Sequence, residues 1–233
     1  MNKRPYKAAA LVAALAAALV VSYFAITGVN EPESELTSTF NLIYSVGSWG
    51  KDAEGKGTSG TGSTLEVTRD YRAYLEAFIR KHNVKSVVDA GCGDWTFSKA
   101  IDWGAASYVG VDIASDVIKE VRRKYEKGTV RFEVGDVTEP LPPADLLISK
   151  DVLQHLSNEL IQKFIMNNLK KGKYKWVLLT NDRGSENRDI QPGYYRLIDL
   201  SAPPFEVKGL VDLPIKFGDQ TNKVTSLLDL TKP

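Results

Sequence analysis

The feature that most constrains the fold of this chain is a short apolar strand. The strand ends in an acid and leads directly into a glycine turn. Residues 85–95 read KSVVDAGCGDW, with Asp89 ending the apolar run and Gly91 and Gly93 in the turn. Glycine adopts backbone angles closed to other residues and lets a ligand approach the main chain closely. A second acid, Asp112, closes another apolar run, YVGVD, about 20 residues beyond the glycines, where a carboxylate meets ribose hydroxyls in doubly wound nucleotide folds. The pattern predicts a protein that binds a cofactor containing adenosine.

Strands and helices are predicted to alternate through the body of the chain. Apolar residues recur at helical spacing over 66–82, and strand-like runs follow at 85–89, 107–111, 129–134, 145–149 and 174–180. Further helices are expected at 95–103, at 116–127 between Ser115 as cap and Gly128 as stop, and at 158–170 after Ser157 as cap. This alternation predicts an α/β fold with a parallel sheet covered by helices on both faces. Two last runs, FEVKGLVDL and KVTSLLDL, have no helix between them and are expected to pair antiparallel at one edge.

The first residues of the chain predict a membrane span. Residues 8–26 form an uncharged stretch of 19 residues, broken only by Ser22 and preceded by three cations. About 20 apolar residues cross a bilayer, whereas the apolar part of a cleaved signal has about 7–15. We expect a basic cytoplasmic tail at 1–7 and a single-pass signal-anchor at 8–27, with the remaining chain on the lumenal or extracellular side. Small residues at the end of the stretch leave a cleaved, secreted form as the alternative.

Residues 28–64 join this span to the rest of the chain. The composition from 37 to 64 is typical of loops, and residues 47–64 contain six glycines. One interpretation is a flexible linker. The other is a lid that closes over a bound cofactor, because Trp49 is a large aromatic residue at the start of a glycine-rich loop.

The charge balance argues against a nucleic-acid substrate. The chain has 30 basic and 29 acidic residues, and without the three cations of the tail 27 basic residues face 29 acidic ones, a net charge of −2. Sequence-independent binding of nucleic acid rests on clustered Lys and Arg. The single cysteine, Cys92, has no partner for an intramolecular disulfide, and no Cys/His cluster has the spacing of zinc ligands.

Four motifs in order, VVDAGCGDW, GVDI, VGDVTEP and DLLISKDVLQHLS, resemble the class I S-adenosylmethionine-dependent methyltransferases. A dinucleotide fingerprint would need a third glycine where this chain has Thr96. The resemblance spans residues 65–233 and implies a Rossmann-like, seven-stranded sheet closed by a C-terminal antiparallel hairpin. It implies S-adenosylmethionine as the cofactor, with Asp112 on the ribose hydroxyls and Asp136 on the adenine amino group. The residues that it assigns to the cofactor are Asp89, Gly91, Gly93, Asp94, Trp95, Asp112, Ile113, Asp136, Val137 and Lys150. For Trp95 the alternative to contact with the cofactor is a position in the core.

The candidate catalytic residues follow the fourth expected strand. Imidazole with its ordinary pKa of about 6.5 accepts a hydroxyl proton at neutral pH, which makes His155 a candidate general base. A structural role in fixing the loop before Ser157 is its alternative. Asp151 is a second candidate base, or a ligand for a divalent cation of the kind that some sugar-methylating relatives use. No metal ligand is assigned.

The acceptor is expected to be an oxygen atom. Relatives that methylate amino groups of nucleic acid or glutamine carry an Asn/Asp-Pro-Pro-aromatic motif where this chain has SKDV. The tract that follows the fifth expected strand, together with the loop at Trp49 and Gly50, is similar to a little-characterised methyltransferase subgroup found beside glycosyltransferases in surface-glycan systems. The resemblance implies a glycan or another small polyhydroxylated acceptor. The residues expected to contact it are Trp49, Asn181, Asp182, Arg183, Tyr194, Tyr195 and Arg196.

Two other functions remain open at this point. One is a nicotinamide-dependent reductase on a similar sheet, which Thr96 argues against. The other is a non-catalytic, membrane-tethered binding module, which the intact Asp89, Asp112 and Asp136 argue against.

Overall fold

The computed structural model describes residues 34–231, and the chain from Leu36 onward forms one compact unit. The predicted tail and membrane span at 1–27 lie outside the described residues. Within residues 34–231, none of the helices combines the length and the apolar character needed to cross a membrane.

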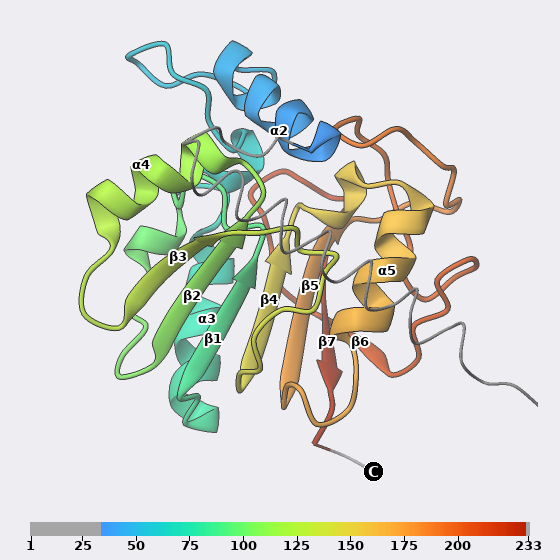
Figure 1. Cartoon of the computed structure of the whole chain (residues 1–233). Helices are drawn as coiled ribbons and strands as arrows, with labels where there is room; N and C mark the ends of the chain where they lie inside the picture. Colours follow the sequence, from blue (N-terminus) through green and yellow to red (C-terminus); the bar gives the residue numbers. More distant parts are fainter. Residues whose placement is uncertain (1–33, 232–233) are drawn as a thin grey trace, which may run out of the picture. The chain divides into compact units, whose positions relative to one another are not determined.

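A seven-stranded sheet with the strand order β3-β2-β1-β4-β5-β7-β6 forms the centre of the fold (Figure 1). Its strands are β1 (Ser86–Ala90), β2 (Ser107–Asp112), β3 (Val130–Val134), β4 (Leu146–Lys150), β5 (Trp176–Asp182), β6 (Leu210–Leu213) and β7 (Lys223–Asp229). The first five strands pair in parallel, and β7 pairs antiparallel with both β5 and β6. The expected α/β sheet with an antiparallel C-terminal pair is confirmed.

Helices cover both faces of this sheet because side chains alternate along its buried strands. In β1, Val87 packs with the residues of helix α3 (Arg69–His82), whereas Val88 packs with those of helix α5 (Asn158–Asn168). Figure 1 shows α3 behind the sheet and α5 in front of it.

Two helix starts test the predicted caps. In α5, the Ser157 hydroxyl accepts a hydrogen bond from the Leu160 amide, as a cap does. Helix α4 (Ser115–Tyr125) begins one residue earlier than expected, so its cap position is Ala114 and the prediction of Ser115 as cap was wrong.

The helix predicted at 95–103 is absent from the structure. Only a 3-10 turn, Ser98–Ala100, forms there. Trp95 adopts a left-handed backbone angle, φ 59°, directly after the glycine turn, and the segment buries Trp95, Phe97, Ile101 and Trp103. Burial of these four large side chains at uneven spacing favours an irregular path over a helix with one apolar face.

Residues 37–46, expected to be loop, belong instead to helix α2 (Glu35–Val46). Phe40 and Tyr44 lie one helical turn apart and are both buried. In Figure 1 this helix, drawn in blue, lies above the carboxyl ends of the parallel strands. The chain order reverses between β1 and β4, and ligands of open α/β sheets bind outside the strand ends at such a switch point.

Candidate functional site

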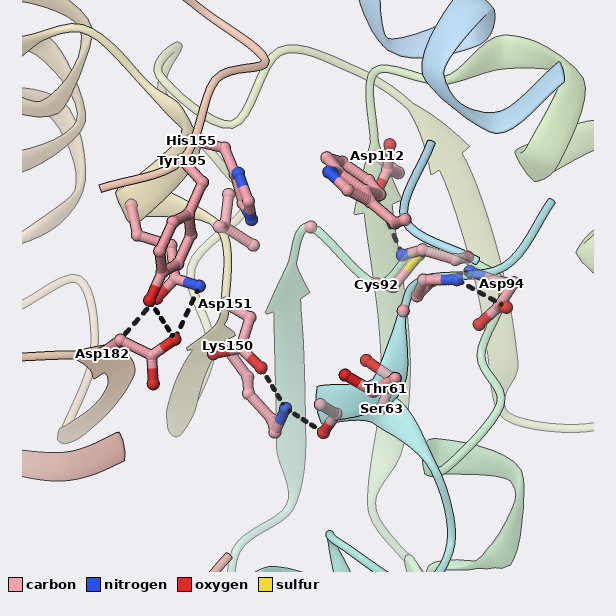
Figure 2. Close-up of a pocket in the computed structure, with 18 of the residues that line it drawn as sticks. Thr61, Ser63, Cys92, Asp94, Asp112, Lys150, Asp151, His155, Asp182 and Tyr195 are labelled. Atoms are coloured by element: carbon pink, nitrogen blue, oxygen red, sulfur yellow. Dashed lines mark hydrogen bonds and ion pairs between the residues drawn. The ribbon is translucent and has the colours of Figure 1, made fainter. Parts of the chain in front are cut away.

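A cavity of about 560 Å³ opens at the carboxyl ends of β1, β2, β4 and β5 (Figure 2). Side chains of α2 and of the glycine-rich loop line it as well. Figure 2 shows Asp112 at one end of the cavity and His155, Tyr195 and Asp182 toward the other. We call these the cofactor end and the acceptor end, after the roles that the sequence predicts for them.

The glycine turn at the cofactor end needs both of its glycines. Gly91 and Gly93 have φ angles of 84° and 54°, in the left-handed region that other residues rarely adopt. A Cβ atom on Gly91 would lie 2.2 Å from Cγ2 of Val152, and one on Gly93 would lie 2.4 Å from Oγ of Ser59. The turn therefore has no room for a larger residue at either position.

Asp112 supports this turn, and the buried carboxylate of Asp89 precedes it in β1. Asp112 accepts hydrogen bonds from the amides of Gly93 and Ala114, each at 2.9 Å, and burial raises its pKa. Asp89 accepts a hydrogen bond of 2.6 Å from the Tyr108 hydroxyl, and burial raises its pKa to about 7. Both carboxylates also line the cavity. Asp112 thus holds the turn and, like Asp89, faces the space where a ligand would lie.

Asp136 and its neighbours line the cavity beyond β3. The Asp136 carboxylate accepts a hydrogen bond of 2.8 Å from the Thr138 amide, which fixes its direction. Ile113 and Val137 line the cavity as well, and Val137 is buried. The cavity lining thus includes an acid and two apolar side chains, a combination suited to a flat polar ring such as adenine.

The glycine-rich loop folds onto the glycine turn and is part of the cavity wall. The Ser59 amide donates to the Asp94 carboxylate at 3.0 Å, and the Asp94 amide donates to the Ser59 hydroxyl at 3.1 Å. The Tyr44 hydroxyl lies 2.9 Å from the same Ser59 hydroxyl. Trp49 packs its ring against Tyr44 and, at a centroid distance of 4.9 Å, against His155.

A cluster of two buried lysines and two partly exposed aspartates lies at the acceptor end. Lys150 contacts Asp151 at 2.5 Å and donates to the Gly62 carbonyl at 2.9 Å. Lys223 contacts Asp151 and also Asp182, the latter at 3.2 Å. The side chains of the two lysines are only 2% and 3% exposed. Charges buried to this degree are retained only when they are paired.

The pKa values of this cluster depend on burial and on the neighbouring charges. Burial alone would raise the pKa of Asp151, but the two ammonium groups outweigh it and hold that pKa below its ordinary value. Burial lowers the pKa of Lys150, and the neighbouring Lys223 adds to this effect. Asp151 is therefore a weak base with both of its oxygens engaged.

The imidazole of His155 lies in the cavity wall. Burial lowers its pKa, so the ring is uncharged at neutral pH. Its Nδ1 lies 3.0 Å from the backbone carbonyl of Tyr194. A carbonyl only accepts, so Nδ1 carries the hydrogen in the neutral ring and Nε2 keeps a free lone pair. His155 lines the cavity, and Figure 2 shows its ring beside Tyr195.

Most of the residues predicted from the sequence line this one cavity. They are Trp49, Asp89, Gly91, Gly93, Asp94, Asp112, Ile113, Asp136, Val137, Lys150, Asp151, His155, Asp182 and Tyr195. The segments that supply them lie far apart in the chain, and the strand ends bring them together.

Five predicted site residues lie outside the cavity lining. Trp95 belongs to the core, where its ring packs against Tyr108 and Phe132. Arg183 pairs with Asp212 on β6.

Arg196 is buried and donates to the backbone carbonyls of Leu156 and Arg188. It also donates to Oδ1 of Asn158 at 2.6 Å, which ties the loop after β5 to the start of helix α5. Asn181 is buried within β5. Tyr194 is 69% exposed and contributes its carbonyl to His155.

Sequence reasoning missed several residues that line the cavity. Lys223, Gln154, Tyr44 and Ser59 line it, as does the turn from 219 to 222. The only signal for Tyr44 was its helical spacing from Phe40, and Lys223 carried no signal within its own segment. Its role becomes visible only when β7 pairs with β5, because Lys223 then lies directly opposite Asp182.

No group of three or more His, Cys, Asp or Glu side chains among residues 34–231 is arranged to hold a metal. Asp151, the residue considered as a ligand, already contacts two ammonium groups.

Comparison with known proteins supports the fold. Residues 87–171 match a family model described as a methyltransferase domain. No curated protein matches the chain.

Three solved structures are similar in fold. The methyltransferase domain of bacterial CtHen1-CN has a TM-score of 0.53 at 13% identity, and the match covers 70% of this chain and 99% of that one. The N-methyltransferase NodS from Bradyrhizobium japonicum WM9, in complex with S-adenosyl-L-homocysteine, has a TM-score of 0.52 at 12% identity, with 69% and 86% covered. The S-adenosylmethionine-dependent methyltransferase SibL, in its apo form, has a TM-score of 0.51 at 16% identity, with 70% and 55% covered. Residues 87–171 are therefore similar to a methyltransferase domain, and the chain has the fold of these S-adenosylmethionine-dependent methyltransferases.

Proposed function

We propose that this protein is an S-adenosylmethionine-dependent methyltransferase that transfers a methyl group to a hydroxyl of a glycan sugar or another small polyhydroxylated acceptor. One observation carries the proposal. A single cavity joins the glycine turn and the carboxylates of Asp112 and Asp136 to a neutral histidine and a charged cluster. Such a cavity can hold a cofactor and an acceptor side by side.

At the cofactor end, each part of S-adenosylmethionine has a matching surface. Asp112 suits the ribose hydroxyls, Asp136 with Ile113 and Val137 suits the adenine ring, and the turn at Gly91 and Gly93 suits the methionine part. The segment after β1 is a 3-10 turn of three residues rather than a long helix. It offers no helix N-terminus for a pyrophosphate, which weighs against the nicotinamide alternative.

At the acceptor end, His155 would take the proton. The bound sulfonium supplies an electrophilic methyl group with a good leaving group, so the protein has mainly to position the acceptor. With the cofactor bound, the acceptor oxygen would bond to the methyl carbon as the carbon–sulfur bond breaks, and Nε2 of His155 would accept the hydroxyl proton. The products would be the methyl ether, S-adenosylhomocysteine and the protonated imidazole, which would return its proton to solvent.

Asp151 serves a different purpose in this proposal. It is predicted from the sequence as an alternative base, but both of its oxygens face ammonium groups and its pKa is lowered. A carboxylate in that state is a poorer proton acceptor than the free Nε2 of His155. We assign Asp151 the role of holding Lys150 and Lys223 in place.

Calorimetry with S-adenosylhomocysteine tests the cofactor half of the proposal. The unaltered protein should bind it, and Asp112→Asn should weaken binding about hundredfold, because two charge-assisted hydrogen bonds to ribose are lost. Asp70→Asn, in the first turn of α3 and outside the cavity lining, is the matched control and should bind as the unaltered protein does. Unchanged affinity in Asp112→Asn would refute the site assignment. Incubation with labelled cofactor and candidate glycans, followed by location of the methyl group, then tests the acceptor half.

We also propose that residues 8–27 anchor the protein in a membrane with the methyltransferase domain on the far side. The support is the 19-residue uncharged stretch with its preceding cations. S-adenosylmethionine is made in the cytosol, so this topology requires an imported supply. Protease treatment of sealed vesicles gives the test: the domain should be protected when its lumen is inside, and digestion without detergent would refute the topology.

A further inference from the structure

We propose that the acceptor end of the cavity selects an uncharged sugar ring and rejects anionic acceptors. In this proposal Asp182 and Tyr195 accept hydrogen bonds from two neighbouring hydroxyls of the sugar. This inference rests on the proposed function and narrows its acceptor class. It is carried by the contacts of Asp182, by the aromatic side chains beside it and by the charges that line the cavity.

Asp182 is held in place with one acceptor position left open. Its Oδ1 contacts Lys223 at 3.2 Å, and its Oδ2 accepts from the Tyr195 hydroxyl at 3.1 Å and from the Gln154 amide at 3.4 Å. An ionised carboxylate has about four lone-pair positions, so three neighbours leave room for one more donor. The side chain is 15% exposed and lines the cavity, so a hydroxyl of a bound molecule can reach it.

Tyr195 supplies the second contact. Figure 2 shows its hydroxyl directed at Asp182. The phenolic oxygen donates to the carboxylate and still accepts through its own lone pairs. The two oxygens are 3.1 Å apart, a spacing close to that of hydroxyls on adjacent carbons of a sugar. Together they can receive two neighbouring hydroxyl donors.

Aromatic rings form a surface beside this pair. The rings of Trp49 and His155 have centroids 4.9 Å apart, and those of His155 and Tyr195 are 5.9 Å apart. We call these three residues the aromatic row. Tyr195 is 56% exposed, although large aromatic side chains usually bury most of their area. An exposed ring in a cavity wall next to a carboxylate offers an apolar face for the carbon–hydrogen side of a sugar ring.

The charges of the lining oppose an anion. Seven aspartates and two lysines line the cavity. The ammonium groups of both lysines are already engaged, Lys150 by Asp151 and Gly62, and Lys223 by Asp151 and Asp182. An acceptor carboxylate or phosphate near Asp182 would meet a like charge, and the described lining residues include no lysine or arginine besides these two to offset it. Contact between like charges is one way in which sites reject a wrong ligand.

Saturation-transfer NMR on the full chain loaded with S-adenosylhomocysteine tests this selectivity without requiring turnover. The probes are the methyl glycosides of glucose, galactose and mannose, each compared with the methyl glycoside of its uronic acid. At least one neutral glycoside should bind and exceed its uronate in affinity by about tenfold, the effect of one like charge at the effective dielectric of a protein site. Asp182→Asn should remove most of that preference.

Two further variants separate the contacts. Asp212→Asn makes the same chemical change on β6, outside the cavity lining, and should keep the preference. Tyr195→Phe keeps the ring and should weaken neutral glycosides less than Tyr195→Ala does.

Three outcomes would overturn the inference. A uronate that binds as well as its neutral partner would refute the charge selection, and failure of all six glycosides in a protein that still binds S-adenosylhomocysteine would refute the sugar class while leaving the methyltransferase proposal intact. Failure to bind S-adenosylhomocysteine would refute the proposed function itself and this inference with it.

Discussion

Replacing Lys223 by Met tests the charge cluster at the residue that contacts both of its aspartates. Methionine keeps most of the length and apolar volume of the side chain and removes the ammonium group. In the native protein that group contacts Asp151 and Asp182, and the side chain is 3% exposed. Asp151 keeps Lys150 at 2.5 Å after the change, so Asp182 is the carboxylate left without a cation.

The expected loss of stability arises at Asp182, because Asp151 keeps a cation and Asp182 does not. Removal of one partner of a buried ion pair costs about 3–5 kcal/mol, and we expect the lower end, about 3 kcal/mol, because Asp182 retains the Tyr195 hydroxyl and the Gln154 amide. For a domain of this size, that free energy lowers the melting temperature by about 6–12 °C. Urea unfolding at pH 8 measures the change directly.

A double-mutant cycle identifies the cause. Asp182→Asn in the Lys223→Met background removes the uncompensated charge, so the double variant should be more stable than the sum of the single changes predicts, by about 1–3 kcal/mol. Asp212→Asn in the same background, an exposed carboxylate paired with Arg183, should add independently. Strict additivity with Asp182→Asn, or a loss below about 1 kcal/mol in Lys223→Met, would refute the assignment of a buried, coupled cluster.

Three further predictions concern the turn, its supporting acid and the candidate base. Gly91→Ala should cost about 2–4 kcal/mol in urea unfolding, because its Cβ would lie 2.2 Å from Val152 Cγ2 at φ 84°; Val152→Ala should recover part of that loss, and full recovery would show that the backbone angle carries no strain. Asp89 has a pKa raised to about 7 by burial, so the native state binds a proton that the unfolded state has released; stability should fall as pH rises from about 4 to 7, and Asp89→Asn should flatten this decline. With an identified acceptor, His155→Gln should reduce turnover about 10²–10⁴-fold at unchanged S-adenosylhomocysteine affinity. Because burial lowers the pKa of His155, turnover of the unaltered protein should be constant above pH 6.5 and fall only at lower pH; a fall that begins above pH 7 would contradict the assignment.

The strands and the cofactor end were predictable because their signals are local. Each expected strand of the parallel part formed within two residues of its predicted position, since apolar runs bounded by turn residues specify buried strands without reference to the rest of the chain. Gly91, Gly93 and Asp112 come together for the same reason: the carboxyl ends of neighbouring parallel strands meet at one edge of the sheet.

The errors fall where distant packing decides the local structure. Residues 95–103 contain enough apolar residues for a helix, but Trp95 is drawn into a cluster with Tyr108 and Phe132 that no local pattern reveals. Helix α2 was hidden because the serines and threonines of ELTSTFNLIYSV have low helix propensity, while Phe40 and Tyr44 gain their stabilisation from packing on Trp49.

The C-terminal strand pair completes the edge of the sheet and also positions a residue of the acceptor end. Strand β7 lies between β5 and β6, and its register sets Lys223 opposite Asp182. A shift of one residue would turn Lys223 to the other face of the sheet and leave Asp182 without a cation at the acceptor end. Because Lys223 also contacts Asp151, the same register gives both strand-end carboxylates an ammonium partner. The register of β7 therefore determines both the stability of the buried cluster and the charge that an acceptor meets.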